Sequence, residues 1–339
     1  DACNTINVQP IGQAGSYTAT DRTSAGYLMS EFGLFGRSRM IVGARVEDAR
    51  ITVNTTTQGG FTNQARLANT DVLPSIVLNT RLGERTNVRL AATQTLARPE
   101  YRELSPVTFR DVLGGVSLTG NDQLVRTLIQ NFDARWEFFP SSGEVISVSL
   151  FGKRFENPIE RVEVATSGSA QARFQNARSA NNYGIELELR KQLGMLGGWG
   201  DRFTFFTNAT VMQSDISIDT TGTASVTNAA RRMVGQAPYV LNSGLTYASL
   251  SGQTTATLLY NVVGPRIVAA GALPLPDIVD KERHVVDLSV RVPVAGERLF
   301  LRADARNLLD ARYRIMQGNL LREGFNAGRV FSVGMQWRQ

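Results

Sequence analysis

Charged residues recur at every second position in several stretches of this sequence. Asp133, Arg135 and Glu137 form one such run, and Arg302 and Asp304 belong to another. Because successive side chains of a β-strand point to opposite faces, each run would place acids and arginines in a row on one face. Such rows can form ion pairs and hydrogen bonds with water. They are costly against lipid, so we expect them to face an aqueous interior.

The same spacing selects a larger set of candidate interior-facing residues. The set comprises Arg39, Arg45, Glu47, Asp133, Arg135, Glu137, Glu186, Glu188, Arg190, Asp287, Arg291, Arg298, Arg302, Asp304 and Arg306. For any one of them the alternative is a solvated wall without a specific partner, because exposed ion pairs contribute little to stability.

Ligand contact is expected from a second set of residues, which lie in polar stretches between the alternating runs. Aromatic rings and guanidinium groups suit sugars, chelates and carboxylates. The candidates are Tyr101, Arg102, Phe109, Arg110, Phe174, Arg178 and Tyr313. The alternative for each is packing against neighbouring loop residues.

Catalytic chemistry finds little support. His284 is the only histidine and has no Cys or His partner for zinc. A serine hydrolase would need a Ser beside this His, but Ser289 falls on the opposite face of the same alternating run. Asp277, Asp280 and Glu282 could bind calcium, yet their spacing is not that of a known calcium loop. We therefore expect no enzyme, no metal site and no cofactor.

Arginine supplies nearly all of the basic charge. The net charge is +6, and Lys153, Lys191 and Lys281 are the only lysines. The arginines are mixed with acids rather than gathered on a helix or a stripe, so nucleic acid is not expected as a partner. Cys3 is the only cysteine, which leaves either a free thiol or a bridge to a residue outside this chain.

No stretch is apolar enough for long enough to cross a membrane as a helix. Transmembrane β-strands escape that test, because every second residue faces a wet interior. The first residues lack the basic segment and apolar core of a signal peptide, so we expect that one has been removed or that the natural start lies upstream.

Alternating runs predict thirteen strands along the 339 residues, and the alternation is cleanest around 181–192 and 129–139. The expected strands are 17–33, 37–53, 70–82, 86–97, 129–139, 144–156, 181–192, 202–215, 238–249, 253–263, 283–292, 297–309 and 329–338. The chain is therefore predicted to be all-β.

Connections between these strands alternate in length. Short turns are expected at 34–36, 83–85, 140–143, 193–201, 250–252 and 293–296, and long polar loops at 54–69, 98–128, 157–180, 216–237, 264–282 and 310–328. Outer-membrane barrels have tight periplasmic turns and long external loops, whereas a soluble sandwich has no reason to sort its connections in this way. The pattern favours an antiparallel transmembrane β-barrel.

Aromatic residues gather beside the short turns and at the end of the chain. They are Phe32, Phe35, Phe138, Phe139, Trp199, Phe203, Tyr247 and Trp337. An interfacial belt of a membrane barrel needs amphipathic rings at one depth, whereas core aromatics need not gather at one end of each hairpin.

The odd strand number bears on the extent of the barrel. Bacterial single-chain barrels have an even number of strands, and an open sheet edge is not tolerated in lipid. We therefore expect at least one strand before Asp1, and interpret residues 1–339 as one domain, the C-terminal portion of a larger barrel.

A series of segments, taken in order, resembles the C-terminal half of the barrel of TonB-dependent outer-membrane receptors. The segments are 95–104 (TLARPEYREL) with 120–121, 151–153 with 157–160, 237–239 with Asn242, 259–261 with Gly264 and Arg266, and 307–310 with Tyr313 and 328–329. Their order and spacing carry the resemblance. One departure is that Arg338 and Gln339 follow Trp337, where such proteins commonly end on an aromatic residue.

The resemblance implies a 22-stranded barrel, the size of plugged outer-membrane transporters, of which this chain would supply about thirteen strands. It also implies a plug domain and a TonB-contacting box that lie outside this sequence. The interior-facing residues would then contact the plug.

The function implied is active import of a scarce large solute, such as chelated iron, cobalamin, a glycan or a peptide, across the outer membrane of a Gram-negative bacterium. Its partners would be outer-membrane lipid, the plug, TonB and the imported substrate. One alternative is a passive porin-like channel with few strands missing. Another is a soluble sugar-binding β-protein.

Overall fold

The computed structural model describes residues 16–56, 61–110, 116–164, 171–218, 226–295 and 298–337. Cys3 lies outside the described residues, so the question of its partner stays open. Within them, strands dominate, and no helix is long and apolar enough to cross a membrane.

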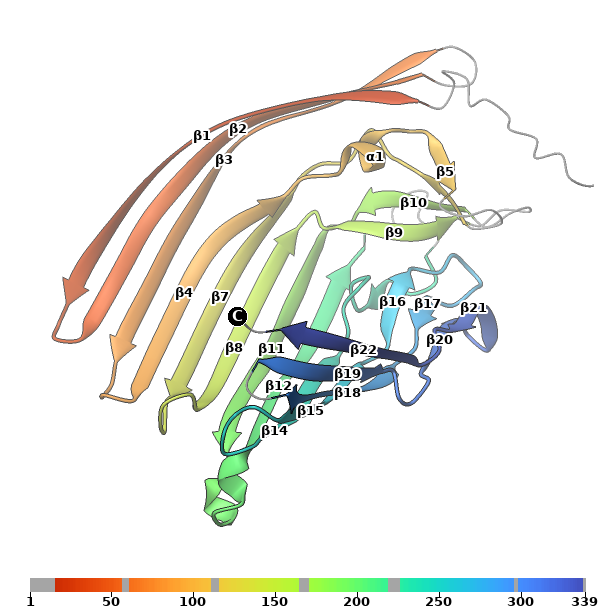
Figure 1. Ribbon diagram of the computed structural model, residues 1–339. Helices are drawn as coiled ribbons and strands as arrows, with labels where there is room; N and C mark the ends of the chain where they lie inside the picture. Colours follow the sequence, from red (N-terminus) through yellow and green to blue (C-terminus); the bar gives the residue numbers. More distant parts are fainter. Residues whose placement is uncertain are drawn as a thin grey trace, which may run out of the picture.

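One antiparallel sheet forms a curved wall (Figure 1). Its pairing path contains β1 (Tyr17–Leu34), β2 (Ser38–Thr56), β3 (Thr62–Arg81), β4 (Thr86–Ala97), β7 (Thr127–Phe138), β8 (Val145–Glu156), β11 (Ser179–Gln192), β12 (Phe203–Ser217), β14 (Tyr239–Ala248), β15 (Thr255–Val263), β18 (Arg283–Ala295), β19 (Leu299–Arg306) and β22 (Val330–Trp337). Each strand pairs with the next along this path, so the predicted thirteen wall strands and their antiparallel order are confirmed for the described residues. In that order β1 and β22 are the end strands.

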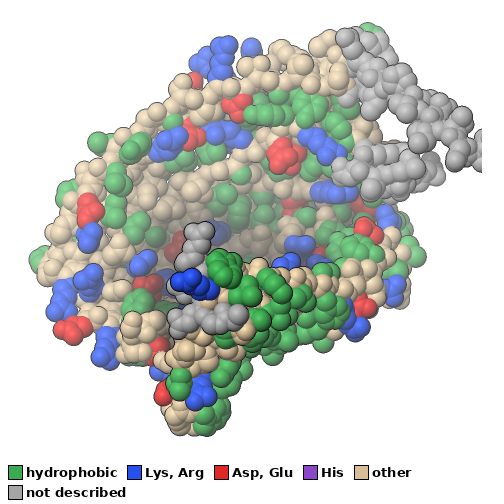
Figure 2. All heavy atoms as spheres, viewed as in Figure 1, with side chains coloured by type: hydrophobic (Ala, Val, Ile, Leu, Met, Phe, Trp, Pro, Cys, Tyr) green, Lys and Arg blue, Asp and Glu red, His purple; other side chains and the backbone are tan. Residues whose placement is uncertain are grey.

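The two faces of the wall differ in chemistry. On β11, Tyr183, Ile185 and Leu187 are about half exposed and alternate with Glu186 and Glu188. We call the face of Leu187 the outer face and the face of Glu188 the inner face. Figure 2 shows hydrophobic side chains gathered over the last strands and a hollow behind them in which charged side chains are visible. An apolar outer face and a polar inner face are the arrangement of a barrel wall in lipid.

Short turns join the strands at one end of the wall, as predicted. β1 and β2 are joined through Gly36, whose φ of +63° is the left-handed conformation that favours glycine. The turn between β11 and β12 contains the 3₁₀ helices η1 (Gly194–Leu196) and η2 (Gly200–Arg202). Near it, the ring of Phe203 lies 5.7 Å from that of Trp199 and 5.3 Å from that of Tyr247. These three predicted belt aromatics therefore form one cluster at the turn end.

The prediction of a loop at 54–69 is wrong, because β2 continues to Thr56 and β3 begins at Thr62. The paired residues Asn54 and Gln64 hydrogen-bond side chain to side chain at 2.8 Å. Their polar side chains made the segment look like a loop, although Val53 and its neighbours keep the alternation of a strand.

The other long connections were predicted as polar loops, but they contain regular structure. One small sheet consists of β5 (Thr108–Arg110), β6 (Ser117–Thr119), β10 (Gln171–Asn176) and β9 (Ile159–Val164), and another of β16 (Arg266–Ala269), β17 (Ile278–Asp280), β20 (Arg312–Gln317) and β21 (Leu320–Asn326). The helix α1 (Tyr101–Leu104) and β13 (Ala230–Arg231) complete the elements of these connections. Each sheet consists of two hairpins, and the pairings of β6 with β10 and of β17 with β20 join hairpins from two different connections.

Candidate functional site

The connection after β4 folds back against the inner face of the first strands (Figure 1). Leu104 of α1 is buried with Ile51 and Val53 of β2 and Leu67 of β3. A capping box between Glu100 and the third residue of α1 starts this short helix. The inner face of β2 and β3 is therefore apolar near the long connections and packs against protein there.

A glycine permits this close packing. A Cβ on Gly120 would lie 2.0 Å from the carbonyl oxygen of Ser105 and 2.6 Å from that of Arg102. The hydroxyls of Ser105 and Thr55 are 2.9 Å apart, and both residues are fully buried. The connection is thus fixed to β2 by apolar contacts and by a buried hydrogen bond.

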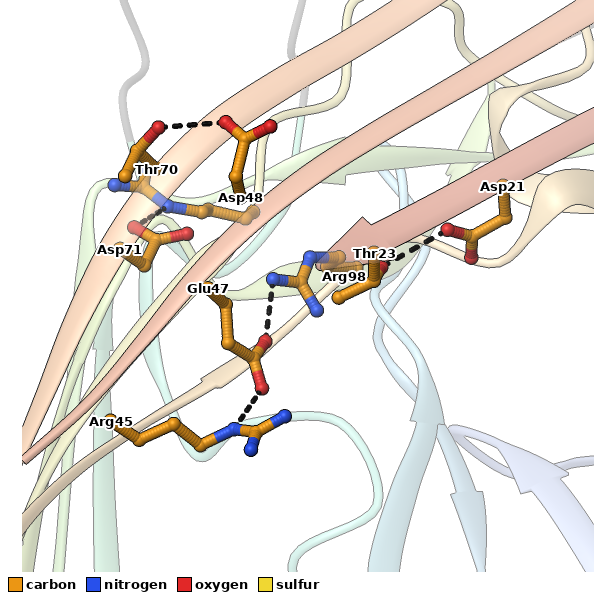
Figure 3. A network of polar contacts seen from close by, with 9 residues as sticks. Asp21, Thr23, Arg45, Glu47, Asp48, Thr70, Asp71 and Arg98 are labelled. Atoms are coloured by element: carbon orange, nitrogen blue, oxygen red, sulfur yellow. Dashed lines mark hydrogen bonds and ion pairs between the residues drawn. The ribbon is translucent and has the colours of Figure 1, made fainter. Parts of the chain in front are cut away.

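Closer to the short turns than this apolar layer, ion pairs lie on the inner face of the first strands (Figure 3). Glu47 accepts hydrogen bonds from Arg45 at 2.6 Å and from Arg98 at 2.8 Å. Asp71 on β3 accepts a hydrogen bond at 2.5 Å from Arg126, which directly precedes β7. These charge-assisted bonds join the wall to both ends of the connection between β4 and β7.

A second network lies between β7 and β11. Arg135 bonds Glu137 on its own strand at 2.8 Å and Glu188, across β8, at 2.5 Å. Its Nη1 also donates to the hydroxyl of Ser149 on the intervening strand. Three of the predicted interior-facing residues are thus brought together.

A third group lies on β18 and β19. The Arg302 Nε is 3.0 Å from Asp304 Oδ2, and the Arg291 guanidinium lies 4.8 Å from the centre of the Phe300 ring. Asp287 accepts a bond from the backbone N–H of Asn307. The interior-facing candidates therefore form three local groups, not one site.

The remaining interior-facing candidates lie apart from these groups. Arg39 pairs with Glu31 at 3.0 Å near the short turns. The other members are exposed in the described structure, namely Asp133, Glu186, Arg190, Arg298 and Arg306. Their predicted contact with a plug stays a prediction.

The predicted ligand-contact residues mostly pack within the long connections. The Tyr101 hydroxyl donates to Asp21 at 3.0 Å, which raises the pKa of this tyrosine. The Arg102 guanidinium lies 4.5 Å from the centre of the Phe109 ring, and Phe174 packs against the cluster around Leu104. These four candidates are brought together at the inner face of the first strands.

The other ligand-contact candidates lie elsewhere. The Tyr313 ring is stacked on Phe325 at 4.7 Å, and the Arg283 guanidinium lies 4.9 Å from its centre. Arg178 precedes β11, and its N–H donates to the Ser217 carbonyl. Arg110 ends β5, but its side chain lies outside the described structure.

Buried polar contacts that sequence reasoning missed hold the long connections together. Arg231 pairs with Glu160, and Arg322 pairs with Glu163 at 3.2 Å. Gln317 donates to the other carboxylate oxygen of Glu163, so the two small sheets are tied to each other. The sequence signal was weak, since Glu160 and Glu163 stand in a short mixed run of apolar and charged residues at 159–164.

Two of the three acids considered for calcium, Asp277 and Asp280, are engaged with protein donors. Asp277 accepts bonds from the N–H of Gly271 and from Asn228, and Asp280 pairs with Arg266. In the part of the chain that the structure describes, no cluster of three metal-ligating side chains is found. The charged groups that the described residues place on the inner face can bind a protein surface or a polar solute.

The comparison with protein families finds one match. The family described as "TonB dependent receptor-like, beta-barrel" matches residues 2–308. No curated protein matches the chain significantly.

Solved structures share the fold. The ferric yersiniabactin uptake receptor of Yersinia pestis aligns with a TM-score of 0.67 at 17% identity, over 95% of this chain and 46% of its own. The FrpB iron transporter of Neisseria meningitidis aligns with a TM-score of 0.64 at 13% identity, over 96% of this chain and 46% of its own. A mutant ferric enterobactin receptor of Pseudomonas aeruginosa, in complex with enterobactin, aligns with a TM-score of 0.58 at 17% identity, over 95% of this chain and 54% of its own. The chain thus spans about half the length of these structures.

Proposed function

This chain belongs to the family of TonB-dependent receptor β-barrels, and from that premise we propose that it forms wall and external loops of an outer-membrane importer. The importer takes up a scarce large solute with energy supplied through TonB. The proposal assigns the plug and the TonB-contacting segment to residues outside this chain.

The observation that carries the proposal is the way the long connections are tied together. The connection after β4 packs on the inner face through Leu104, and the two small sheets are joined through Glu163. A passive pore gains little from long connections that are bonded to one another. A receptor gains a preformed surface, because ordering before binding reduces the entropic cost of capture.

Chelated iron is the solute class to test first. Three of the similar structures are a ferric yersiniabactin uptake receptor, an iron transporter and a ferric enterobactin receptor. The arginine and aromatic side chains of the connections suit the anionic and ring groups of such chelates. Cobalamin, glycans and peptides are the other members of the test panel.

The experiment measures uptake of a panel of labelled solutes by cells that carry the complete protein as their only receptor, with and without functional TonB. The expected result is saturable uptake of one class that is lost without TonB. Uptake that persists without TonB would overturn the proposal.

A planar-bilayer measurement on the same protein separates the importer from the porin-like alternative. A blocked barrel with little conductance agrees with the importer, and a large steady conductance favours a channel. A protein that stays in the aqueous phase after detergent partition would contradict both and favour the soluble sugar-binding alternative.

A further inference from the structure

The outer face of β1, β2 and β3 changes from apolar to basic within a few residues. Val46 and Val72 are paired across β2 and β3, and both are about half exposed. The next outward pair on these strands is Asp48 with Thr70. Two residues further along β2 stands Arg50, so the apolar band ends at Val46.

Three arginines gather directly beyond this boundary. Arg22 on β1 is the register partner of Arg50 on β2. Arg66 on β3 pairs with Thr52, the next outward residue of β2. Like charges directly opposite each other on neighbouring strands destabilise a sheet, so this arrangement has a cost that a bound anion would remove.

The charge of the three arginines is only partly balanced on this face. Asp48 Oδ2 lies 3.4 Å from Arg50 Nε, and its other oxygen accepts a bond from Thr70. The neighbouring acids Glu47 and Asp71 belong to the inner face, where they bond other arginines. The Arg50 side chain is 73% exposed, so its guanidinium is available to a ligand.

A depression of about 490 Å³ lies at this place. Its lining includes Thr20, Arg22, Asp48, Arg50, Thr52 and Arg66. Guanidinium groups form bidentate bonds with phosphate oxygens, and threonine hydroxyls can donate to them. The lining therefore suits a phosphorylated sugar better than an apolar ligand.

The height of the cluster above the apolar band fits a membrane surface. Arg50 lies four residues beyond Val46, which is about 13 Å along the strand at about 3.3 Å per residue. With the usual strand tilt, this is about 10 Å above the hydrocarbon boundary. Arginine side chains can extend back toward that boundary, so they reach the headgroup layer.

We propose that Arg22, Arg50 and Arg66 form a binding site on the outer face for the phosphorylated sugar headgroup of the outer-leaflet glycolipid, lipopolysaccharide. The inference rests on the proposed outer-membrane function, which supplies that lipid. The site differs from the solute path, since it lies on the opposite face from Glu47 and Asp71. Asp48 holds Arg50 in place through their ion pair.

The test replaces the three arginines together, as Arg22→Gln, Arg50→Gln and Arg66→Gln, in the complete protein. Lipopolysaccharide that copurifies with it is measured by mass spectrometry, and binding to vesicles containing lipid A is measured over a range of salt. We expect about a tenfold or greater loss of binding, since several charge-assisted phosphate contacts disappear. Dephosphorylated lipid A should bind the unchanged protein as weakly as lipid A binds the triple variant.

The matched control is Arg37→Gln, Arg81→Gln and Arg202→Gln, which removes the same charge from exposed arginines at the short-turn end. This control should bind as the unchanged protein does. Equal loss in both variants would show a general charge effect and overturn the site. Full competition by millimolar inorganic phosphate would show a site for free anions, and would overturn the lipid assignment.

Heat-modifiable gel mobility checks that each variant is folded. Normal TonB-dependent uptake together with unchanged lipid A binding in the triple variant would reject the glycolipid site and leave the importer standing. Loss of TonB dependence in the unchanged protein, with lipid A binding intact, would reject the importer instead.

Discussion

Arg231 and Glu160 form an ion pair with 2.5 Å between Nη2 and Oε2, although 71 positions separate them in the sequence. Their side chains are 3% and 2% exposed, and Glu160 also accepts a bond from the N–H of Val234. The pair joins the connection after β8 to the connection after β12. Because both charges are buried, each depends on the other.

We predict that Glu160→Ala releases this junction. Removal of one partner leaves the other as an uncompensated buried charge, which costs about 3–5 kcal/mol. Limited proteolysis should cleave within 226–237 much faster, while the wall keeps its heat-modifiable mobility. Glu156→Ala removes an exposed carboxylate nearby and is the control. Equal cleavage in both variants would contradict a special role of the pair.

Gly120→Ala is predicted to displace α1 from the inner face. Its Cβ would meet backbone oxygens at 2.0 Å and 2.6 Å, and backbone cannot move aside as a flexible side chain can. Overpacking of this kind costs about 1–3 kcal/mol. Hydrogen exchange of the Leu104 amide should increase. Gly152→Ala, where a Cβ would have nothing within 4 Å, should leave that exchange unchanged.

The wall strands could be predicted from the sequence because their signal is local. Leu187 and Glu188 reveal the two faces of β11 without knowledge of its neighbours. Along β2, however, the inner face changes from charged to apolar residues and the outer face from apolar to charged ones. Arg45 faces inward among charged groups, but further along the strand Ile51 is inward and Arg50 outward. A rule that places every charge inside misses the site on the outer face.

The candidate sites were harder to predict than the strands, because their contacts join distant segments. Arg135 and Glu137 share a strand, and their spacing alone suggested an interaction. Glu163 and Gln317 bond across 154 positions, and no local pattern links them. Each small sheet joins two hairpins through one pairing between separate connections, and no local pattern indicates that pairing.

Arg135→Ala is predicted to weaken the wall between β7 and β11. Glu137 is nearly buried and would keep an ion pair with Arg89 at 3.4 Å in place of the shorter one with Arg135, and Glu188 would lose its bond to Arg135. Since Arg135 is partly exposed, we expect a loss of about 1–3 kcal/mol. The measurement is the temperature at which the complete protein loses heat-modifiable mobility. Arg190→Ala, at an exposed position of the same face, should change it little.

Acidification is predicted to loosen the short turn between β7 and β8. Hydrogen bonds from the Lys191 ammonium and the Ser141 hydroxyl hold the pKa of Glu144 below its usual value. Because the pKa of this carboxylate is lower in the folded state than in the unfolded state, it stabilises the fold at pH values above the unfolded-state pKa. This stabilisation is lost as the pH falls through the folded-state pKa.

The reporter for this turn is the Gln192 amide, which donates to Glu144 Oε1 at 3.1 Å. After correction for intrinsic exchange, its hydrogen exchange should increase as Glu144 is protonated. In Glu144→Gln this pH dependence should vanish. An unchanged exchange profile in that variant would show that another group is responsible.

The chain of 339 residues on its own is predicted not to form a stable monomeric barrel in lipid. In the pairing order of the described residues, β1 and β22 end the sheet, and β1 alone is 18 residues long. The outward backbone groups of an unpaired edge cost several kcal/mol each in hydrocarbon, because no water satisfies them. Refolding into vesicles should therefore give oligomers or aggregates that protease degrades, whereas the complete protein resists it. A protease-resistant monomer made of this chain alone would mean that β1 and β22 can pair and close the wall.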